Sequence, residues 1–286
     1  MRTIIISDIS ETSDSIIPFG LNIGKHTQTK VDILHCFDPA IIQGPYSPYS
    51  DSQSITPGEK LSHEEILKRE KGIISDKLSR FLSREASVLN YPLRVNTITD
   101  IGDIESCITE QIENHENPLI ITGTKPGGSM TVGLQELLKV IFKLNVMVMI
   151  IPPGKKFSKP NTCWLVTDLH AEGNGKIKKL FDWINPLVEK VLTSVVVRVN
   201  TKSNHNEAIN DWREALQPYT DKADVDAIEI FRVCNIHTCL DSICDQKNPH
   251  IAVLPKNKNS FFRKYLLAHN NAKKLTESIN IPVLLY

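Results

Sequence analysis

The sequence predicts an α/β protein made of two tandem, doubly wound parallel sheets of five strands each, with a Rossmann-like architecture. Short β-branched apolar runs alternate with helical stretches, which is typical of parallel sheets covered on both faces. A segment rich in proline, glycine and lysine interrupts this pattern near residues 152–160, and the same order of elements then begins again. We therefore expect two domains, residues 1–152 and residues 160–286.

Five apolar runs predict the strands of the first domain, at residues 3–7, 31–37, 93–98, 118–122 and 146–151. The first helical stretch carries Gly20 and Gly24 on its apolar face, where small residues let a helix lie close to a sheet. The second helix is expected to begin at a capping box formed by Ser62 and Glu65. Residues 38–60 lack apolar periodicity, so they predict a long surface loop inserted in this domain.

The second domain repeats this order with predicted strands at residues 163–167, 195–199, 227–233, 250–254 and 281–285. One helix is expected to run from Phe262 through Leu275 before the last strand. The last strands of the two domains would leave exposed edges, so we expect them to pair within the chain as a pseudo-dimer. Whether two chains associate further into a homodimer is left open by the sequence.

Composition narrows the class of protein. Lysine and arginine number 33, as do aspartate and glutamate, so no positive field is available to attract nucleic acid. No apolar run reaches membrane length, and the N-terminal run is broken by Asp8, so neither a membrane span nor a signal peptide is expected. Most of the six cysteines read as reduced thiols, which favours a cytoplasmic protein.

Two strings at the start, RTIIISDISETSDSIIPFGLNIG and VDILHCFDP, resemble the opening of universal stress protein domains. The terminal run NAKKLTESINIPVLLY is similar to that family's C-terminal signature, and TCWLVTDLH repeats the opening more faintly. The resemblance spans nearly the whole chain and implies a fold of the adenine-nucleotide-binding type. In nucleotide-binding members, a loop of the pattern Gly-x2-Gly-x9-Gly, followed by Ser or Thr, holds phosphates with its backbone amides.

The first domain keeps this glycine loop only in part. Gly123 fits the first glycine, whereas Pro126 stands at the second and Glu136 near the third. The loop still offers backbone donors, so the resemblance implies an ATP or AMP site in this domain. Its implied contact residues are Ser7, Asp8, Ile9, Cys36, Gly123, Gly127, Gly128 and Ser129. The alternative is an ordinary strand-to-helix turn, with Ser129 and Asp8 serving only as helix or turn caps.

The second domain has lost the pattern altogether. Pro255, Lys258 and Ala268 replace the three glycines, and His269 stands in place of the Ser or Thr. We therefore expect no nucleotide there.

The resemblance implies a stress-response regulatory protein that is not an enzyme, because no P-loop, metal-carboxylate set or nucleophile–base pair is evident. A protein-interaction module is the alternative, with an unidentified partner and the loop at residues 38–60 as its contact surface. A nucleotide hydrolase or transferase is the third and least favoured reading.

Two further groups of residues could in principle bind a metal or take part in acid–base chemistry. Cys234, His237, Cys239 and Cys244 are potential zinc ligands, but they contain no Cys-x2-Cys pair, so buried thiols are favoured. His170 lies close to Asp168 and could take part in acid–base chemistry, yet no nucleophile accompanies it. We interpret His170 as a loop histidine.

Overall fold

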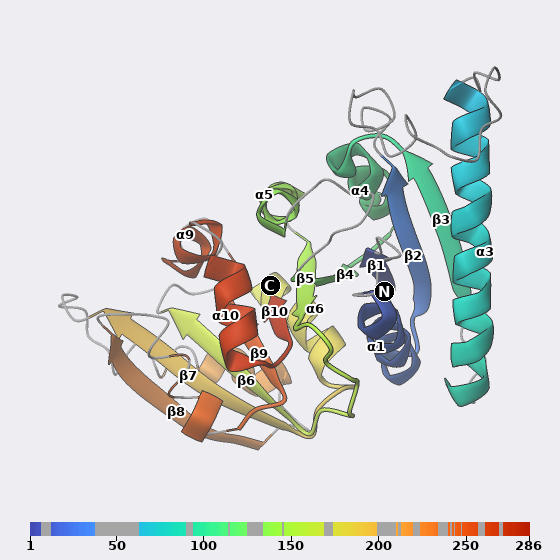
Figure 1. Ribbon diagram of the computed structural model, residues 1–286. Coiled ribbons are helices and arrows are strands. Elements are labelled where there is room, and N and C mark those ends of the chain that lie inside the picture. Colours follow the sequence, from blue (N-terminus) through green and yellow to red (C-terminus); the bar gives the residue numbers. More distant parts are fainter. Residues whose placement is uncertain are drawn as a thin grey trace.

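The computed structural model describes most of the chain. The described residues are 1–6, 13–37, 63–89, 94–113, 115–124, 134–144, 146–168, 174–198, 210, 213–219, 224–233, 240, 242, 244–246, 248–256, 261–268 and 271–286. Ten strands of this part form one sheet in the order β3-β2-β1-β4-β5-β10-β9-β6-β7-β8. Figure 1 shows this sheet running through the whole molecule.

The first half contributes five parallel strands in the order β3-β2-β1-β4-β5. They are β1 (Arg2–Ile6), β2 (Lys30–Phe37), β3 (Val95–Ile101), β4 (Pro118–Gly123) and β5 (Met147–Ile151). Most of the buried residues of β1, β2, β4 and β5 are Ile, Leu, Val or Met, as expected of strands covered on both sides, whereas the edge strand β3 is partly exposed.

The second half repeats this arrangement with the order β8-β7-β6-β9-β10, again parallel within the half. Its strands are β6 (Thr162–Asp168), β7 (Lys190–Arg198), β8 (Asp224–Val233), β9 (Ile251–Leu254) and β10 (Val283–Leu285). Asn117 and Asn248 lie just before the corresponding strands β4 and β9, and both have positive φ angles, of 49° and 45°. The repeat therefore extends to the conformation of single turn residues.

The two halves share one sheet, which corrects the expectation of two separate five-stranded sheets. Strands β5 and β10 pair antiparallel with the register Ile150–Val283, Met149–Leu284 and Val148–Leu285. Each of these strands is the last of its half and would otherwise present an unpaired apolar edge. Pairing them covers both edges at once, so one continuous sheet results.

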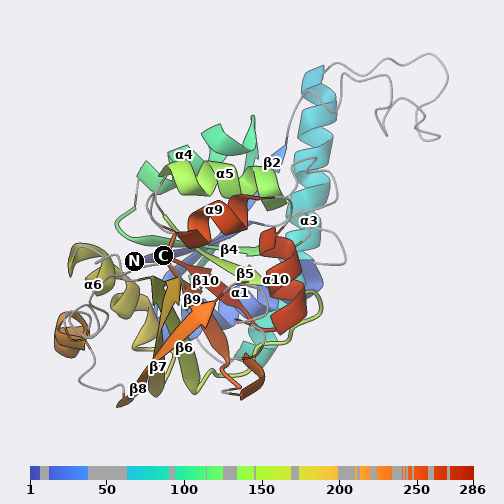
Figure 2. The ribbon, with the colours of Figure 1, turned by 90° about the vertical axis from the view of Figure 1, so that its left-hand side faces the viewer.

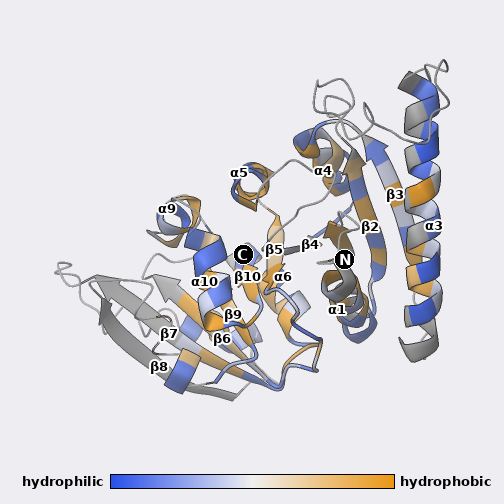
Figure 3. Ribbon diagram, viewed as in Figure 1, coloured by the Kyte–Doolittle hydropathy of each residue, from blue (hydrophilic) through white to orange (hydrophobic). Residues whose placement is uncertain are grey.

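Helices cover both faces of the sheet. One face packs against α1 (Ser13–Thr27), α3 (His63–Leu89), α6 (Asn174–Ile184) and the short helix η1 (Gln217–Tyr219). The other packs against α4 (Ile104–Glu113), α5 (Leu134–Leu144), α9 (Phe261–Leu267) and α10 (Asn271–Ile279). Figure 2 shows the two layers, and Figure 3 shows hydrophobic residues concentrated on the strands between them. Each face has one hydrophobic cluster that includes residues of both halves.

Helix α1 lies against the sheet at Gly20, as its sequence predicts. A Cβ atom at Gly20 would lie 2.6 Å from Cγ1 of Ile5 and 3.5 Å from Cδ1 of Ile121. Real Cβ atoms essentially never come within 3.0 Å of another atom, so a larger residue would require the helix or the Ile5 side chain to shift.

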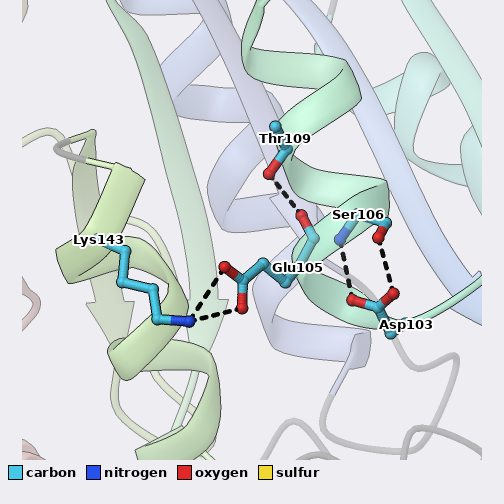
Figure 4. Close-up of polar contacts among 5 residues, drawn as sticks. All are labelled: Asp103, Glu105, Ser106, Thr109 and Lys143. Carbon is cyan, nitrogen blue, oxygen red and sulfur yellow. Dashed lines mark hydrogen bonds and ion pairs between the residues drawn. The ribbon is translucent and has the colours of Figure 1, made fainter.

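Helix α4 begins at a well-formed cap, drawn in Figure 4. The Ser106 backbone N–H donates to Asp103 Oδ1 at 3.0 Å, and the Ser106 hydroxyl donates to Oδ2 at 2.7 Å. Within the helix, the Thr109 hydroxyl donates to the Glu105 carbonyl. The Glu105 carboxylate also pairs with Lys143 of α5 at 2.9 Å, so it joins two helices of the same layer.

The connector between the halves is packed onto α1. Phe157 contacts Phe19 edge-on, with ring centroids 5.2 Å apart, and stacks on His26 with centroids 5.3 Å apart. Burial is the main cause of a lowered pKa at His26, and the positive charges of Lys159 and Lys25 add to it.

Several predicted boundaries differ from the structure. The single helix expected from Phe262 to Leu275 is two helices, α9 and α10, because the chain leaves the helix after Leu267 and the Asn271 side chain donates to the Tyr265 carbonyl. Strand β7 begins at Lys190 rather than at 195, since its first residues include polar ones that weaken the apolar signal. Helix α6 ends at Ile184, although the apolar pattern from Ile177 predicts a helix that continues to Val188. The predicted loop at 38–60 lies outside the described residues.

Candidate functional site

The carboxyl ends of the first-half strands meet at one edge of the sheet. Strand β1 lies between β2 and β4 in the sheet. Helix α1, which follows β1, covers one face, whereas α4 and α5, which precede and follow β4, cover the other. The strand order therefore reverses between β1 and β4. In open α/β sheets, ligands bind in the crevice outside the carboxyl ends of the strands at such a point.

Two described segments border this crevice. Strand β1 ends at Ile6, and β4 ends at Gly123, the position of the first glycine of the phosphate-binding pattern. The implied contact residues Ser7, Asp8 and Ile9 continue from the first segment, and Gly127, Gly128 and Ser129 continue from the second. All six lie outside the described residues, so their roles remain predictions. The structure nonetheless brings the strands that lead into both segments side by side.

Thr124 follows Gly123 directly, and sequence reasoning missed it. Its side chain is only 3% exposed, and its hydroxyl has no hydrogen-bond partner among the described residues. A buried hydroxyl without a partner costs about 1–3 kcal/mol. At the end of β4, this hydroxyl is therefore available to donate to a ligand bound at the carboxyl edge. The string GTKPGGS places a threonine directly after the strand, but nothing in the string indicates that this threonine is buried.

The side chain of Cys36 packs against α4. Cys36 lies on β2 beyond Leu34, the last residue of β2 paired with β1, and its side chain is 4% exposed. A hydrogen bond with Cys107 of α4 is the main cause that raises the pKa of the Cys36 thiol, and burial adds to it. The thiol is therefore neutral and turned toward the helix layer that contains Cys107.

The corresponding edge of the second half differs in its chemistry. Strand β6 ends at Asp168, and β9 is followed by Pro255, which has no backbone N–H to offer a phosphate. Lys258 and His269, which replace later positions of the pattern, lie outside the described residues, as does His170. The described part of this edge therefore lacks the amide donor that the first half has at Gly123.

The cysteines of the described chain are core thiols. Cys36, Cys107, Cys163 and Cys244 are all free and buried. Burial raises the pKa of Cys163 to about 12, so this thiol stays protonated at neutral pH. Among the described residues, no group of three or more His, Cys, Asp or Glu side chains could hold a metal ion. The other three residues of the potential zinc cluster lie outside the described residues; they are Cys234, His237 and Cys239.

Comparisons with known proteins agree with this architecture. A universal stress protein from Archaeoglobus fulgidus superposes with a TM-score of 0.60 at 10% sequence identity, covering 99% of this chain and 95% of its own. A putative universal stress protein from Pseudomonas aeruginosa gives a TM-score of 0.52 at 13% identity, covering 99% and 92%. The chain has the universal stress protein fold. No sequence model of a known family and no curated protein sequence matches it.

The same fold also occurs in a different setting. The cytoplasmic domain of a prokaryotic cation chloride cotransporter superposes with a TM-score of 0.52 at 9% identity, covering 99% of this chain and 93% of that domain. At such identities the likeness concerns the fold alone. No helix in the described ranges is both long and apolar enough to cross a membrane.

Proposed function

We propose that this chain is a cytoplasmic regulatory protein of the universal stress protein type, which binds ATP or AMP at the carboxyl edge of its first half and catalyses no reaction. The observation that carries the proposal is Thr124. This threonine holds a buried hydroxyl without a described partner where β4 runs into the glycine-containing loop, next to β1. Nucleotide phosphates supply the acceptors that such a hydroxyl and the loop amides require.

The direct test is equilibrium binding of ATP and AMP to the purified chain and to a Gly127→Glu, Gly128→Glu variant. Two carboxylates in the loop would repel the phosphates, so we expect the variant to lose binding. Mass spectrometry of the denatured chain, purified from cells, would identify a nucleotide that stays bound. Binding that is absent from the wild-type chain, or that the variant keeps unchanged, would refute the nucleotide site.

A Thr124→Val substitution tests the hydroxyl itself. Valine has nearly the same shape, so the fold should be kept and the free chain should gain stability, by up to about 1 kcal/mol, because the buried hydroxyl that is removed has no partner among the described residues. Affinity for the nucleotide should fall about tenfold, the equivalent of one hydrogen bond of about 1.4 kcal/mol.

Thr193→Val is the matched control for this substitution. Thr193 lies on β7 in the second half, is 1% exposed, and also has a hydroxyl without a partner among the described residues. The same chemical change there should alter stability but leave nucleotide affinity unchanged. Equal effects of the two substitutions on affinity would argue against a role for Thr124 in binding.

A protein-interaction module is the second candidate, and the structural match to the cytoplasmic domain of a transporter favours it. In this reading both clefts are empty, and surfaces of the chain carry the signal. Failure of ATP and AMP to bind the wild-type chain, together with capture of one specific partner, would support it over the nucleotide proposal.

A further inference from the structure

Strand β3 forms one edge of the ten-stranded sheet. It pairs with β2 on one side, and no described strand pairs with it on the other. Figure 1 shows β3 as the outermost strand of the first half. The Arg94 carbonyl, just before β3, accepts from the Val31 N–H of β2 at 3.0 Å. Because successive residues of a strand direct their backbone groups to alternate sides, those of every second residue from Val95 to Ile101 face outward at this edge.

The middle of this edge is accessible. Asn96 and Thr97 are both exposed, although their side chains point to opposite faces of the sheet. Helix α3 contacts β3, but it leaves this part of the strand uncovered. Val95 and Ile98 are half-buried, Val95 against the hydrophobic cluster of one face and Ile98 against that of the other. A further strand at this edge would cover the remaining surface of both.

The composition of β3 does not block such an addition. Natural proteins protect edge strands with charged residues, prolines or bulges. The opposite edge strand of the sheet, β8, has this protection, since four of its ten residues are charged and a register shift interrupts its pairing with β7. Residues 95–99 of β3 are Val-Asn-Thr-Ile-Thr, without a charge, a proline or a glycine. The formal net charge of zero also leaves no general repulsion between copies of the chain.

The sequence of β3 is complementary to itself in an antiparallel pair centred on Ile98. In this register, Ile98 lies opposite Ile98 of a second copy as a non-hydrogen-bonded pair, with Cα atoms about 4.5 Å apart. Thr97 lies opposite Thr99 and exchanges backbone hydrogen bonds with it, because the backbone groups of both face outward. Asn96 lies opposite Asp100, whose carboxylate can accept from the Asn96 amide. No pair between residues 95 and 101 brings like charges together.

We propose that β3 is the contact surface for a second copy of this chain, which adds its own β3 in antiparallel orientation about a two-fold axis. The contact is isologous, because the same surface of both copies forms it. Antiparallel pairing of equivalent strands already joins the halves within one chain, at β5 and β10. The axis is perpendicular to the sheet, so the ten-stranded sheets of the two copies join into one.

The first test is the mass of the chain in solution, measured by sedimentation velocity over a range of concentrations. We expect a dimer at about 100 μM that dissociates on dilution. Thr97→Pro removes an N–H that points away from β2, so the fold should be kept. Its dimer dissociation constant should rise by roughly tenfold or more, because a hydrogen bond is lost from both Thr97–Thr99 pairs. Thr97→Val keeps the N–H and is the matched control, which should still dimerise.

A charge swap tests the register. A chain with Thr97→Lys and Thr99→Lys places like charges opposite each other in the proposed pair, so it should be monomeric. A chain with Thr97→Glu and Thr99→Glu should be monomeric for the same reason. An equimolar mixture of the two should form a heterodimer, because each lysine then lies opposite a glutamate. This recovery would show that both charged chains are folded.

The proposal fails if the wild-type chain is monomeric at about 100 μM, which would leave this edge to a strand of another protein. It also fails if Thr97→Pro dimerises as tightly as Thr97→Val, since the copies would then meet at another surface. A mixture of the two charged chains that stays monomeric would contradict the register and overturn the proposal.

Discussion

Gly20 is the residue at which α1 comes closest to the sheet, and its neighbour Ile5 sets the limit. A Gly20→Ala substitution should destabilise the chain by about 1–3 kcal/mol, because its Cβ atom would overlap Ile5. Urea unfolding followed by circular dichroism measures this change.

Gly72 provides the matched control for that substitution. It lies in the middle of α3, it is exposed, and a Cβ atom there would meet nothing within 4 Å. Gly72→Ala should therefore stabilise the chain by about 0.5–1 kcal/mol through helix propensity alone. If both substitutions stabilised the chain, the close approach of α1 to the sheet would be wrong.

Gly20 and Thr124 differ in how far their structural roles could be predicted from the sequence. Gly20 lies on a periodic apolar face, so its spacing predicts the close approach that the structure confirms. Thr124 is one polar residue between a strand and a loop, and nothing in its local pattern shows that it is buried. Burial of this kind depends on neighbours from distant segments, which sequence spacing does not specify.

At the scale of elements, the cap of α4 should make the stability of the fold depend on pH. The hydroxyl and the backbone N–H of Ser106 both donate to Asp103 and lower the pKa of its carboxyl group. The ionised cap therefore stabilises the fold above the unfolded pKa of about 3.9 and loses this contribution as pH falls through the lower folded value. Asp103→Ala should cost about 1 kcal/mol at pH 7 and progressively less in strong acid.

Asp103→Asn is the control for this pH dependence. Its amide oxygen can still accept the hydrogen bond from the Ser106 N–H, so its cost should be smaller than that of Asp103→Ala at every pH. Both variants lack the ionisable carboxyl, so both costs should diminish by the same amount between pH 7 and pH 3, which unfolding free energies at the two pH values measure. A cost for Asp103→Ala that did not diminish in acid would contradict the ionised cap.

The contact between the connector and α1 at His26 should also make the stability of the fold depend on pH. The pKa of His26 is lowered by burial and by Lys159 and Lys25, so the folded chain favours the neutral ring. As the pH falls below about 6.5, His26 becomes protonated in the unfolded chain but stays neutral in the folded chain. The folded chain therefore loses stability as the pH falls, until the pH reaches the lower pKa of His26 in the folded chain. His26→Phe keeps a ring against Phe157 but cannot be protonated.

The measurement is the unfolding free energy of both chains at pH 7.5 and pH 5.5. The wild-type chain should lose more stability than the His26→Phe variant over this interval. Parallel pH profiles for the two chains would show that His26 is not held in its neutral form.

Element boundaries were predicted well where the apolar pattern is strong and poorly where it is mixed. Strand β4 is continuous Pro-Leu-Ile-Ile-Thr-Gly, and its predicted and observed bounds differ by one residue. Strand β7 begins with Lys, which hid its start. Helix α9 is followed by a short polar segment with two asparagines, which did not stand out from the helical pattern on either side. Helix α3 begins at His63, next to the predicted capping box, although Ser62 itself lies outside the described residues.

At the scale of the whole molecule, contacts on both faces of the sheet join the halves. On one face, the Trp183 indole N–H donates to the Asn117 carbonyl at 3.1 Å, and the Asn117 amide donates to the Lys179 carbonyl at 3.1 Å. On the other, the Gln135 amide donates to the Leu267 carbonyl. The repeat was evident in the sequence, but these contacts were not, because each joins segments far apart in the chain.

The continuous sheet is the central claim, and a pair of cysteines across its middle tests it most directly. Met149 and Leu284 are opposite each other in the β5–β10 register, so a Met149→Cys, Leu284→Cys chain should form a disulfide within one molecule on mild oxidation in dilute solution. Val253 is the partner of Leu284 on β9 and lies two strands from Met149, about 9.5 Å away.

A Met149→Cys, Val253→Cys chain is therefore the control. Peptide mapping of the oxidised monomer should show the 149–284 link in the first chain and no 149–253 link in the second. A 149–284 link found only between two molecules, or equal linking of both pairs, would contradict the single sheet.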